Sequence, residues 1–159
     1  MIGLGKMGGN MARRLARGGV RAALFDAVVR KVAVARPPEL LAVLRSGLLR
    51  LEALAEGADD GDAYAETTYR LVIITARHCG NPRLQRMLAA LSLQTLRYSK
   101  LGLRSTDRRK RSVKLWRQSL HALERGDVER LGALSRMRIE ESGAEAAKQL
   151  SLLGSSHER

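Results

Sequence analysis

Cysteine, aromatic residues and proline are all scarce in this chain. Cys79 is the single cysteine, so an internal disulfide is excluded and a reducing compartment is expected. Aromatic residues make up 3% of the sequence and prolines number three, whereas leucine, alanine and arginine recur throughout. Because this composition suits helices packed through aliphatic side chains better than β-strands, we predict an all-α fold.

Long hydrophobic runs are also missing. No apolar run approaches the roughly 20 residues that a helix needs to cross a bilayer. Near the N-terminus, Lys6, Arg13 and Arg14 interrupt the apolar stretches, which is unlike the pattern of a secretory signal. We therefore expect a cytoplasmic protein without a membrane partner.

Acidic residues are few relative to basic ones. The chain has 29 Lys and Arg against 16 Asp and Glu, which gives a formal net charge of +13. Such an excess attracts polyanions such as nucleic acids, and it is equally compatible with solvated faces rich in arginine. With 159 residues, 45% of them hydrophobic, the chain can bury one sizeable core.

The first residues carry the glycine pattern G-x-G-x-x-G of a dinucleotide-binding loop. Gly3, Gly5 and Gly8 have the required spacing, Val20–Phe25 could form a second strand, and Asp26 is placed to bind a ribose. This segment resembles the N-terminus of the 6-phosphogluconate and 3-hydroxyisobutyrate dehydrogenases. The resemblance implies NAD or NADP as cofactor and a dinucleotide-binding-like fragment over residues 1–26.

Several features compete with this oxidoreductase interpretation. Only Met1 and Ile2 remain for the first strand, and the catalytic lysine and the rest of the sheet have no counterpart downstream. An enzyme of this type would therefore be truncated and inactive, and we expect no enzyme. The apolar stretch Val20–Val34 is also compatible with the first helix of a bundle. A third interpretation is a hybrid chain, in which a dehydrogenase start is joined to the end of another protein.

Beyond Pro37 the sequence divides into amphipathic helical blocks. They cover residues 38–56, 62–79, 82–98, 106–125 and 128–150. Gly80-Asn81-Pro82 predicts a tight turn between two helices, with Asn81 as the N-cap and Pro82 in the first turn. Residues 99–105 are expected to connect two helices, and 154–159 to form a frayed tail. Successive helices with short loops predict an antiparallel bundle over residues 27–153.

The helical part resembles the effector-binding FCD (FadR C-terminal type) domain of GntR-type transcription regulators over residues 37–150. The phrases that carry the resemblance are Gly61-Asp62-Ala63-Tyr64, Cys79-Gly80-Asn81-Pro82-Arg83-Leu84, Gln94-Thr95-Leu96-Arg97-Tyr98 and Leu120-His121-Ala122-Leu123-Glu124-Arg125-Gly126-Asp127. It implies a bundle of six or seven helices that binds a small carboxylate, forms a homodimer and controls a DNA-binding winged helix. The segment before Pro37 is too short for that winged helix, so DNA binding would need a separate domain.

Many members of the resembled family hold a metal through an Asp-x-x-x-His pair and two later histidines. Counting from the interhelical turns places Thr68, Val72, Trp116 and Arg138 at these four positions. A valine and an indole cannot coordinate a metal, and a guanidinium stays protonated, so we expect no metal. Arg138 could bind a carboxylate directly, with Thr68 as a neutral donor and Trp116 as a flat wall. The alternative is that Trp116 fills the core and Arg138 reaches the surface.

Two further groups of residues are candidates for chemistry. His78 and Cys79 are adjacent, but neighbours on a helix point about 100° apart, so a helix-end histidine and a buried thiol are expected instead. Nine basic residues cluster between Arg97 and Arg117, and they could contact phosphates or form a solvated face. They are Arg97, Lys100, Arg104, Arg108, Arg109, Lys110, Arg111, Lys114 and Arg117.

Overall fold

The protein folds as a bundle of helices, and the part of the chain that is described contains no strand. The computed structural model describes the backbone of residues 4–57 and 61–155 and the side chains of residues 17–57 and 61–152. The helices are α1 (Leu4–Ala35), α2 (Pro38–Glu56), α3 (Asp62–Arg77), α4 (Pro82–Gly102), α5 (Thr106–Arg125) and α6 (Val128–Ser155). The predicted all-α class is confirmed.

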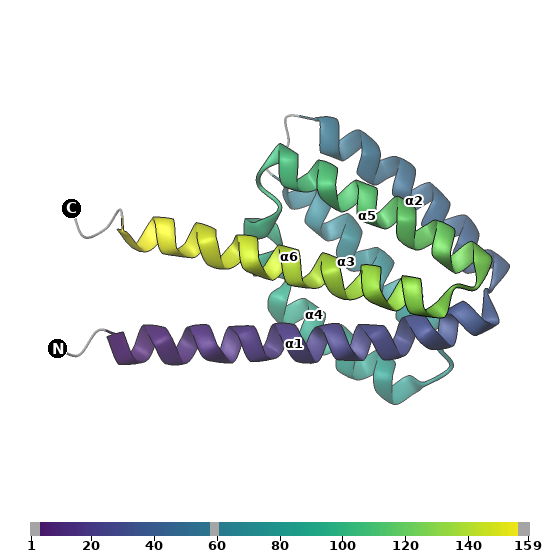
Figure 1. Cartoon of the computed structure of the whole chain (residues 1–159), viewed down its shortest axis with the longest axis horizontal. Coiled ribbons are helices and arrows are strands. Elements are labelled where there is room, and N and C mark those ends of the chain that lie inside the picture. Colours follow the sequence, from purple (N-terminus) through teal and green to yellow (C-terminus); the bar gives the residue numbers. More distant parts are fainter. Residues whose placement is uncertain (1–3, 58–60, 156–159) are drawn as a thin grey trace.

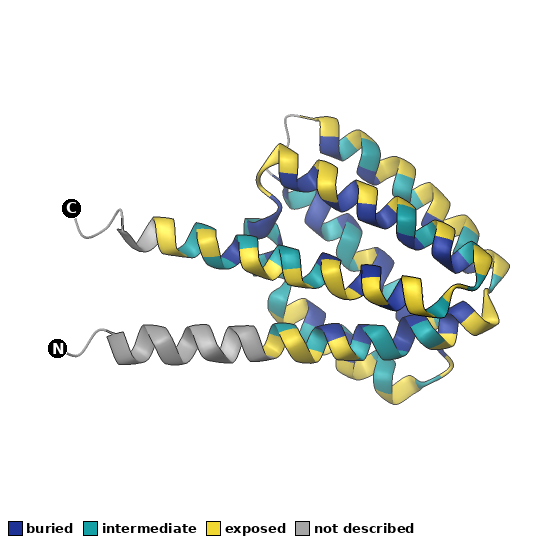
Figure 2. Ribbon diagram, viewed as in Figure 1, coloured by how far each residue is buried: buried dark blue, intermediate teal, exposed yellow. Residues whose placement is uncertain are grey.

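The two longest helices, α1 and α6, lie side by side and extend beyond the other four at the same side of the molecule (Figure 1). Helix α5 packs against α2 and α6, and α3 packs against α4. Figure 2 shows that the buried residues face the space enclosed by the helices. No helix of the described residues is long and apolar enough to span a membrane.

Local capping explains where the helices begin and end. The Asn81 side chain accepts hydrogen bonds from the backbone N–H groups of Arg83 and Leu84, and Pro82 is the first residue of α4. Helix α5 ends at Gly126, whose φ of 68° suits a residue without a side chain. These turns were expected. Helix α4, however, continues to Gly102, so the predicted connection at 99–105 shortens to residues 103–105.

The expected strand over Val20–Phe25 is wrong, because these residues lie inside α1. Phe25, Val28, Val29 and Val32 are buried at helical spacing, and packing that stripe against the bundle determines the conformation. Short apolar runs do not by themselves distinguish a strand from a helix.

The dinucleotide-binding loop is likewise not formed. Gly5 and Gly8 lie within α1, whereas Gly3 lies outside the described residues. Asp26, the expected ribose ligand, instead forms ion pairs with Arg30 and Arg136. The boundary expected between residues 26 and 27 falls inside the same helix. Of the expected tail, 154–155 belong to α6 and 156–159 lie outside the described residues.

One buried arginine joins two loops of the bundle. Arg109 on α5 is 1% exposed, and its guanidinium donates to the carbonyl oxygens of Leu103, Arg104 and Gly57 and to the hydroxyl of Thr106. It thereby ties the end of α2 to the connection between α4 and α5.

Candidate functional site

The four positions picked out by the sequence come together in one small cavity inside the bundle. Thr68 and Val72 reach it from α3, Trp116 from α5 and Arg138 from α6. The cavity has a volume of about 40 Å³. The remaining lining residues are Arg21, Phe25, Ser99, Leu103, Arg108, Ser112, Ile139 and Ser142.

Arg138 and Trp116 form the centre of this site. The guanidinium carbon of Arg138 lies 3.5 Å from the ring centroid of Trp116 and 5.7 Å from that of Phe25. Arg138 is 8% exposed and Trp116 is 7% exposed. The sequence left open whether Arg138 faces the cavity or reaches the surface, and the surface alternative is wrong. Trp116 fills the core and also covers one face of the Arg138 guanidinium.

Three guanidinium groups from three helices line the cavity, namely those of Arg21 (α1), Arg108 (α5) and Arg138 (α6). Burial lowers the pKa of Arg21 to about 10. Burial, together with the charges of Arg21 and Arg108, lowers the pKa of Arg138 to about 9. Burial also lowers the pKa of Arg108. All three shifts indicate that the fold holds positive charge where water cannot solvate it well.

The protein's own carboxylates compensate this charge only in part. Glu141 lies 3.4 Å from Nη1 of Arg108. Within the described side chains, no carboxylate forms an ion pair with Arg21 or Arg138, and the Nε atoms of both are buried without a hydrogen-bond partner. Since buried charges are normally paired, this arrangement is typical of a site for an anion.

The other two predicted residues have simpler roles than expected. The Thr68 hydroxyl donates to the Ala65 carbonyl oxygen at 2.7 Å, so its hydrogen is already engaged and the oxygen can only accept. Val72 is buried and contributes an aliphatic wall. Among the described residues, no group of three or more His, Cys, Asp or Glu side chains could hold a metal ion.

Sequence reasoning missed Arg21 and Arg108. A signal was available, because each precedes buried residues at helical spacing. Arg21 lies four residues before Phe25, and Arg108 lies four and eight residues before Ser112 and Trp116. A charged residue in phase with the apolar face of a helix is a candidate for a buried functional group.

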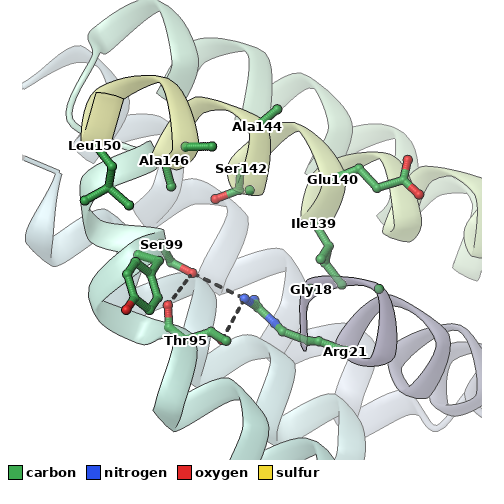
Figure 3. A pocket seen from close by; sticks show the side chains of 14 residues that line it. Gly18, Arg21, Thr95, Ser99, Ile139, Glu140, Ser142, Ala144, Ala146 and Leu150 are labelled. Carbon is green, nitrogen blue, oxygen red and sulfur yellow. Dashed lines mark hydrogen bonds between the residues drawn. The ribbon is translucent and has the colours of Figure 1, made fainter. Parts of the chain in front are cut away.

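A second, larger pocket adjoins the cavity. It has a volume of about 360 Å³ and lies between α1, α4 and α6 (Figure 3). Arg21, Ser99, Ile139 and Ser142 line both spaces. Nη1 of Arg21 donates to Thr95 Oγ1 at 3.1 Å and to Ser99 Oγ at 3.3 Å, which fixes the guanidinium at the junction.

The basic cluster between Arg97 and Arg117 is used mainly within the fold. Five of its members form ion pairs with carboxylates of other helices, namely Lys100, Arg108, Lys110, Arg111 and Arg117. Arg109 is the buried arginine that joins the loops, and Arg97 stacks on Tyr98 with 4.7 Å between its guanidinium carbon and the ring centroid. These contacts favour the interpretation as a solvated, internally paired face.

The candidate Cys–His pair lies at the end of α3. The ring Nδ1 of His78 hydrogen-bonds with the Ile74 carbonyl, and the buried Cys79 thiol donates to the Asn81 carbonyl oxygen. Both side chains thus face backbone acceptors. His121 is exposed, and His157 lies outside the described residues.

An all-helical bundle with a buried arginine site at its centre is the arrangement that these residues define. The family model described as the FCD domain matches residues 19–141. The chain therefore belongs to the FCD domain family, and the match begins earlier than the resemblance predicted from the sequence. It includes Val20–Phe25 and Asp26, so the dehydrogenase-like interpretation of this segment is not supported.

A solved structure gives independent support for the fold. Its description states that Lar controls the expression of the Listeria monocytogenes agr system and mediates virulence. The TM-score is 0.73 at 17% sequence identity, over 87% of this chain and 65% of that chain. At this identity the likeness shows the fold alone, and the present chain spans about two thirds of the length of the solved chain. No curated protein matches the sequence.

Proposed function

We propose that this chain is the ligand-sensing domain of a GntR-type transcriptional regulator and that it recognises a small carboxylate through arginine instead of a metal. FCD domains serve as the ligand-sensing C-terminal domains of such regulators. The observation that carries the proposal is the set of three guanidinium groups around one cavity, each of which has a buried Nε atom without a hydrogen-bond partner.

The chemistry of the lining fits this role. A carboxylate accepts hydrogen bonds from two guanidinium N–H groups at once, and in a desolvated site such charge-assisted bonds are strong. The anion would relieve the repulsion between Arg21, Arg108 and Arg138 and would thereby draw α1, α5 and α6 together. We propose that this movement is the signal passed to a DNA-binding winged helix, in a cytoplasmic, homodimeric regulator without catalytic activity.

Titration calorimetry and the fluorescence of Trp116 test this function. Acetate, butyrate, lactate and succinate would be added to the wild-type chain and to the Arg138→Met variant. The expected result is that at least one carboxylate binds the wild type, changes its emission and does not bind the variant. If no carboxylate binds, or if the variant binds equally well, the proposal is wrong.

A further inference from the structure

The pocket between α1, α4 and α6 has walls made of small residues. On α6 they are Ser142, Gly143, Ala144, Ala146 and Ala147, and on α1 they are Gly18 and Gly19. Side-chain atoms built at Gly18 or Gly143 would meet nothing within 4 Å, so both glycines border open space. Among the described residues, the hollow thus lies where Gly18 and Gly143 carry no side chain. Ile139 and Leu150 add an apolar lining.

Its size and chemistry differ from those of the inner cavity. The pocket of about 360 Å³ falls in the range of small-molecule sites, whereas the cavity of about 40 Å³ has room only for a small polar group. Arg21 lines both the pocket and the cavity. Hydrogen bonds to Thr95 and Ser99 orient its guanidinium, whereas its Nε has no hydrogen-bond partner among the described residues. A largely apolar pocket thus adjoins a positively charged cavity, and the two share Arg21 as a lining residue.

We infer that the effector is an amphipathic monocarboxylate, with its carboxylate between Arg21 and Arg138 and its apolar arm in the outer pocket. This inference rests on the proposed function and deepens it, because it distinguishes a medium-chain aliphatic acid from a compact polar acid. A dicarboxylate is unsuited to the site, since its second charge would lie in the apolar pocket without a partner.

The chain-length dependence of binding tests the inference. Butyrate, hexanoate and octanoate would be titrated calorimetrically into the wild-type chain, with succinate and octan-1-ol as comparison ligands. Each methylene that enters the pocket should strengthen binding about three- to fourfold, so octanoate should bind on the order of 100-fold more tightly than butyrate. Octan-1-ol should bind much more weakly than octanoate because it carries no charge.

Two variants of one glycine provide the structural test. Gly18→Leu fills the pocket from α1, and Gly18→Ala is the matched control that adds a single carbon at the same position. Both changes favour the helix, so loss of folding is not expected. Gly18→Leu should abolish the preference for octanoate over butyrate while leaving butyrate affinity within about threefold of the wild type. Gly18→Ala should keep the preference.

The outcomes separate this inference from the proposed function. Butyrate could bind in a way that requires Arg138 while octanoate binds no more tightly than butyrate. In that case the sensing function stands and the amphipathic effector is ruled out. The same holds if succinate binds more tightly than octanoate, or if Gly18→Leu retains the chain-length preference. If no carboxylate binds at all, both proposals fail together.

Discussion

The guanidinium of Arg138 lies face-on to the indole ring of Trp116, 3.5 Å from its centroid, in the interior of the bundle. A desolvated cation–π contact is worth about 2 kcal/mol. The effective cost of burying an ion is several kcal/mol, so the ring only partly offsets it. The fold therefore tolerates a charge that destabilises the free protein, as binding sites commonly do.

Replacing this charge should raise stability and remove function together. Methionine has a similar length and can keep a sulfur contact with Trp116. We expect Arg138→Met to increase the free energy of unfolding by about 1–4 kcal/mol in the absence of ligand. Urea denaturation followed by circular dichroism measures this change.

The surface arginine Arg136 provides the control, because it is half-exposed and lies two residues away on α6. Arg136→Met should change the free energy of unfolding by less than about 0.5 kcal/mol. A loss of stability in Arg138→Met would mean that the fold itself compensates the charge, and the argument for an anion site would then fail.

Parts of the site could be predicted from the sequence because they depend on local signals. The turns at Asn81 and Gly126 are set by capping chemistry, and from these two turns the metal-ligand positions of the resembled family could be aligned with Thr68, Val72, Trp116 and Arg138. Arg21 and Arg108 are in phase with buried residues of their helices, which makes them candidates. Whether such a charge is buried, however, depends on how α1 and α5 pack against the bundle.

The N-terminal segment shows the opposite case, in which a local signal was misleading. The spacing of Gly5 and Gly8 matches a nucleotide loop, but such a loop requires a preceding strand and a parallel neighbour. Phe25 and Val32 instead complete the buried face of α1. Tertiary packing overrides a short motif where the surrounding elements do not support it.

NADP should consequently fail to stabilise the protein. Asp26 is held by Arg30 and Arg136, and the helix around it leaves no strand to present a ribose ligand. In a thermal-shift assay, NAD or NADP at 1 mM should leave the melting temperature unchanged, whereas a bound carboxylate should raise it. A rise with NADP that Asp26→Asn abolishes would restore the oxidoreductase interpretation.

Arg109 should be among the most sensitive positions for stability, although its place in the basic cluster suggested a surface role. Arg109→Met removes the donor for three carbonyl groups and the Thr106 hydroxyl, so it should lower the free energy of unfolding by about 2–4 kcal/mol. The exposed neighbour Lys114→Met should change it by less than about 0.5 kcal/mol. Equal effects of the two substitutions in urea denaturation would contradict this role.

Tyr64 should make stability depend on pH in the alkaline range. Its hydroxyl donates to the Arg109 carbonyl, and burial raises the pKa of Tyr64 to about 12. Below about pH 10 the phenol is protonated in both the folded and the unfolded state, so its contribution is fully present. Between pH 10 and 12 only the unfolded state releases the proton, and stability falls.

Tyr64→Phe isolates this contribution, because phenylalanine does not titrate. From pH 9.5 to 12, the wild type should lose on the order of 2 kcal/mol relative to the variant in chemical denaturation. Phenolate absorbance near 295 nm should show one tyrosine that ionises late in the wild type and is missing from the variant. A constant difference between the two proteins across this range would show that the phenol is not protected.

DNA binding by the basic cluster should be weak and only slightly sensitive to salt. Ion pairs and buried contacts occupy most of its members, which leaves Arg97, Arg104 and Lys114 to meet phosphates. Each neutralised phosphate contributes about −0.9 to the slope of log K against log salt concentration, so a slope of about −3 or shallower is expected. Fluorescence anisotropy with a labelled duplex measures it, and Lys114→Gln should reduce the slope by about one. A slope of about −6 would mean that the ion pairs open and that the basic cluster binds nucleic acid.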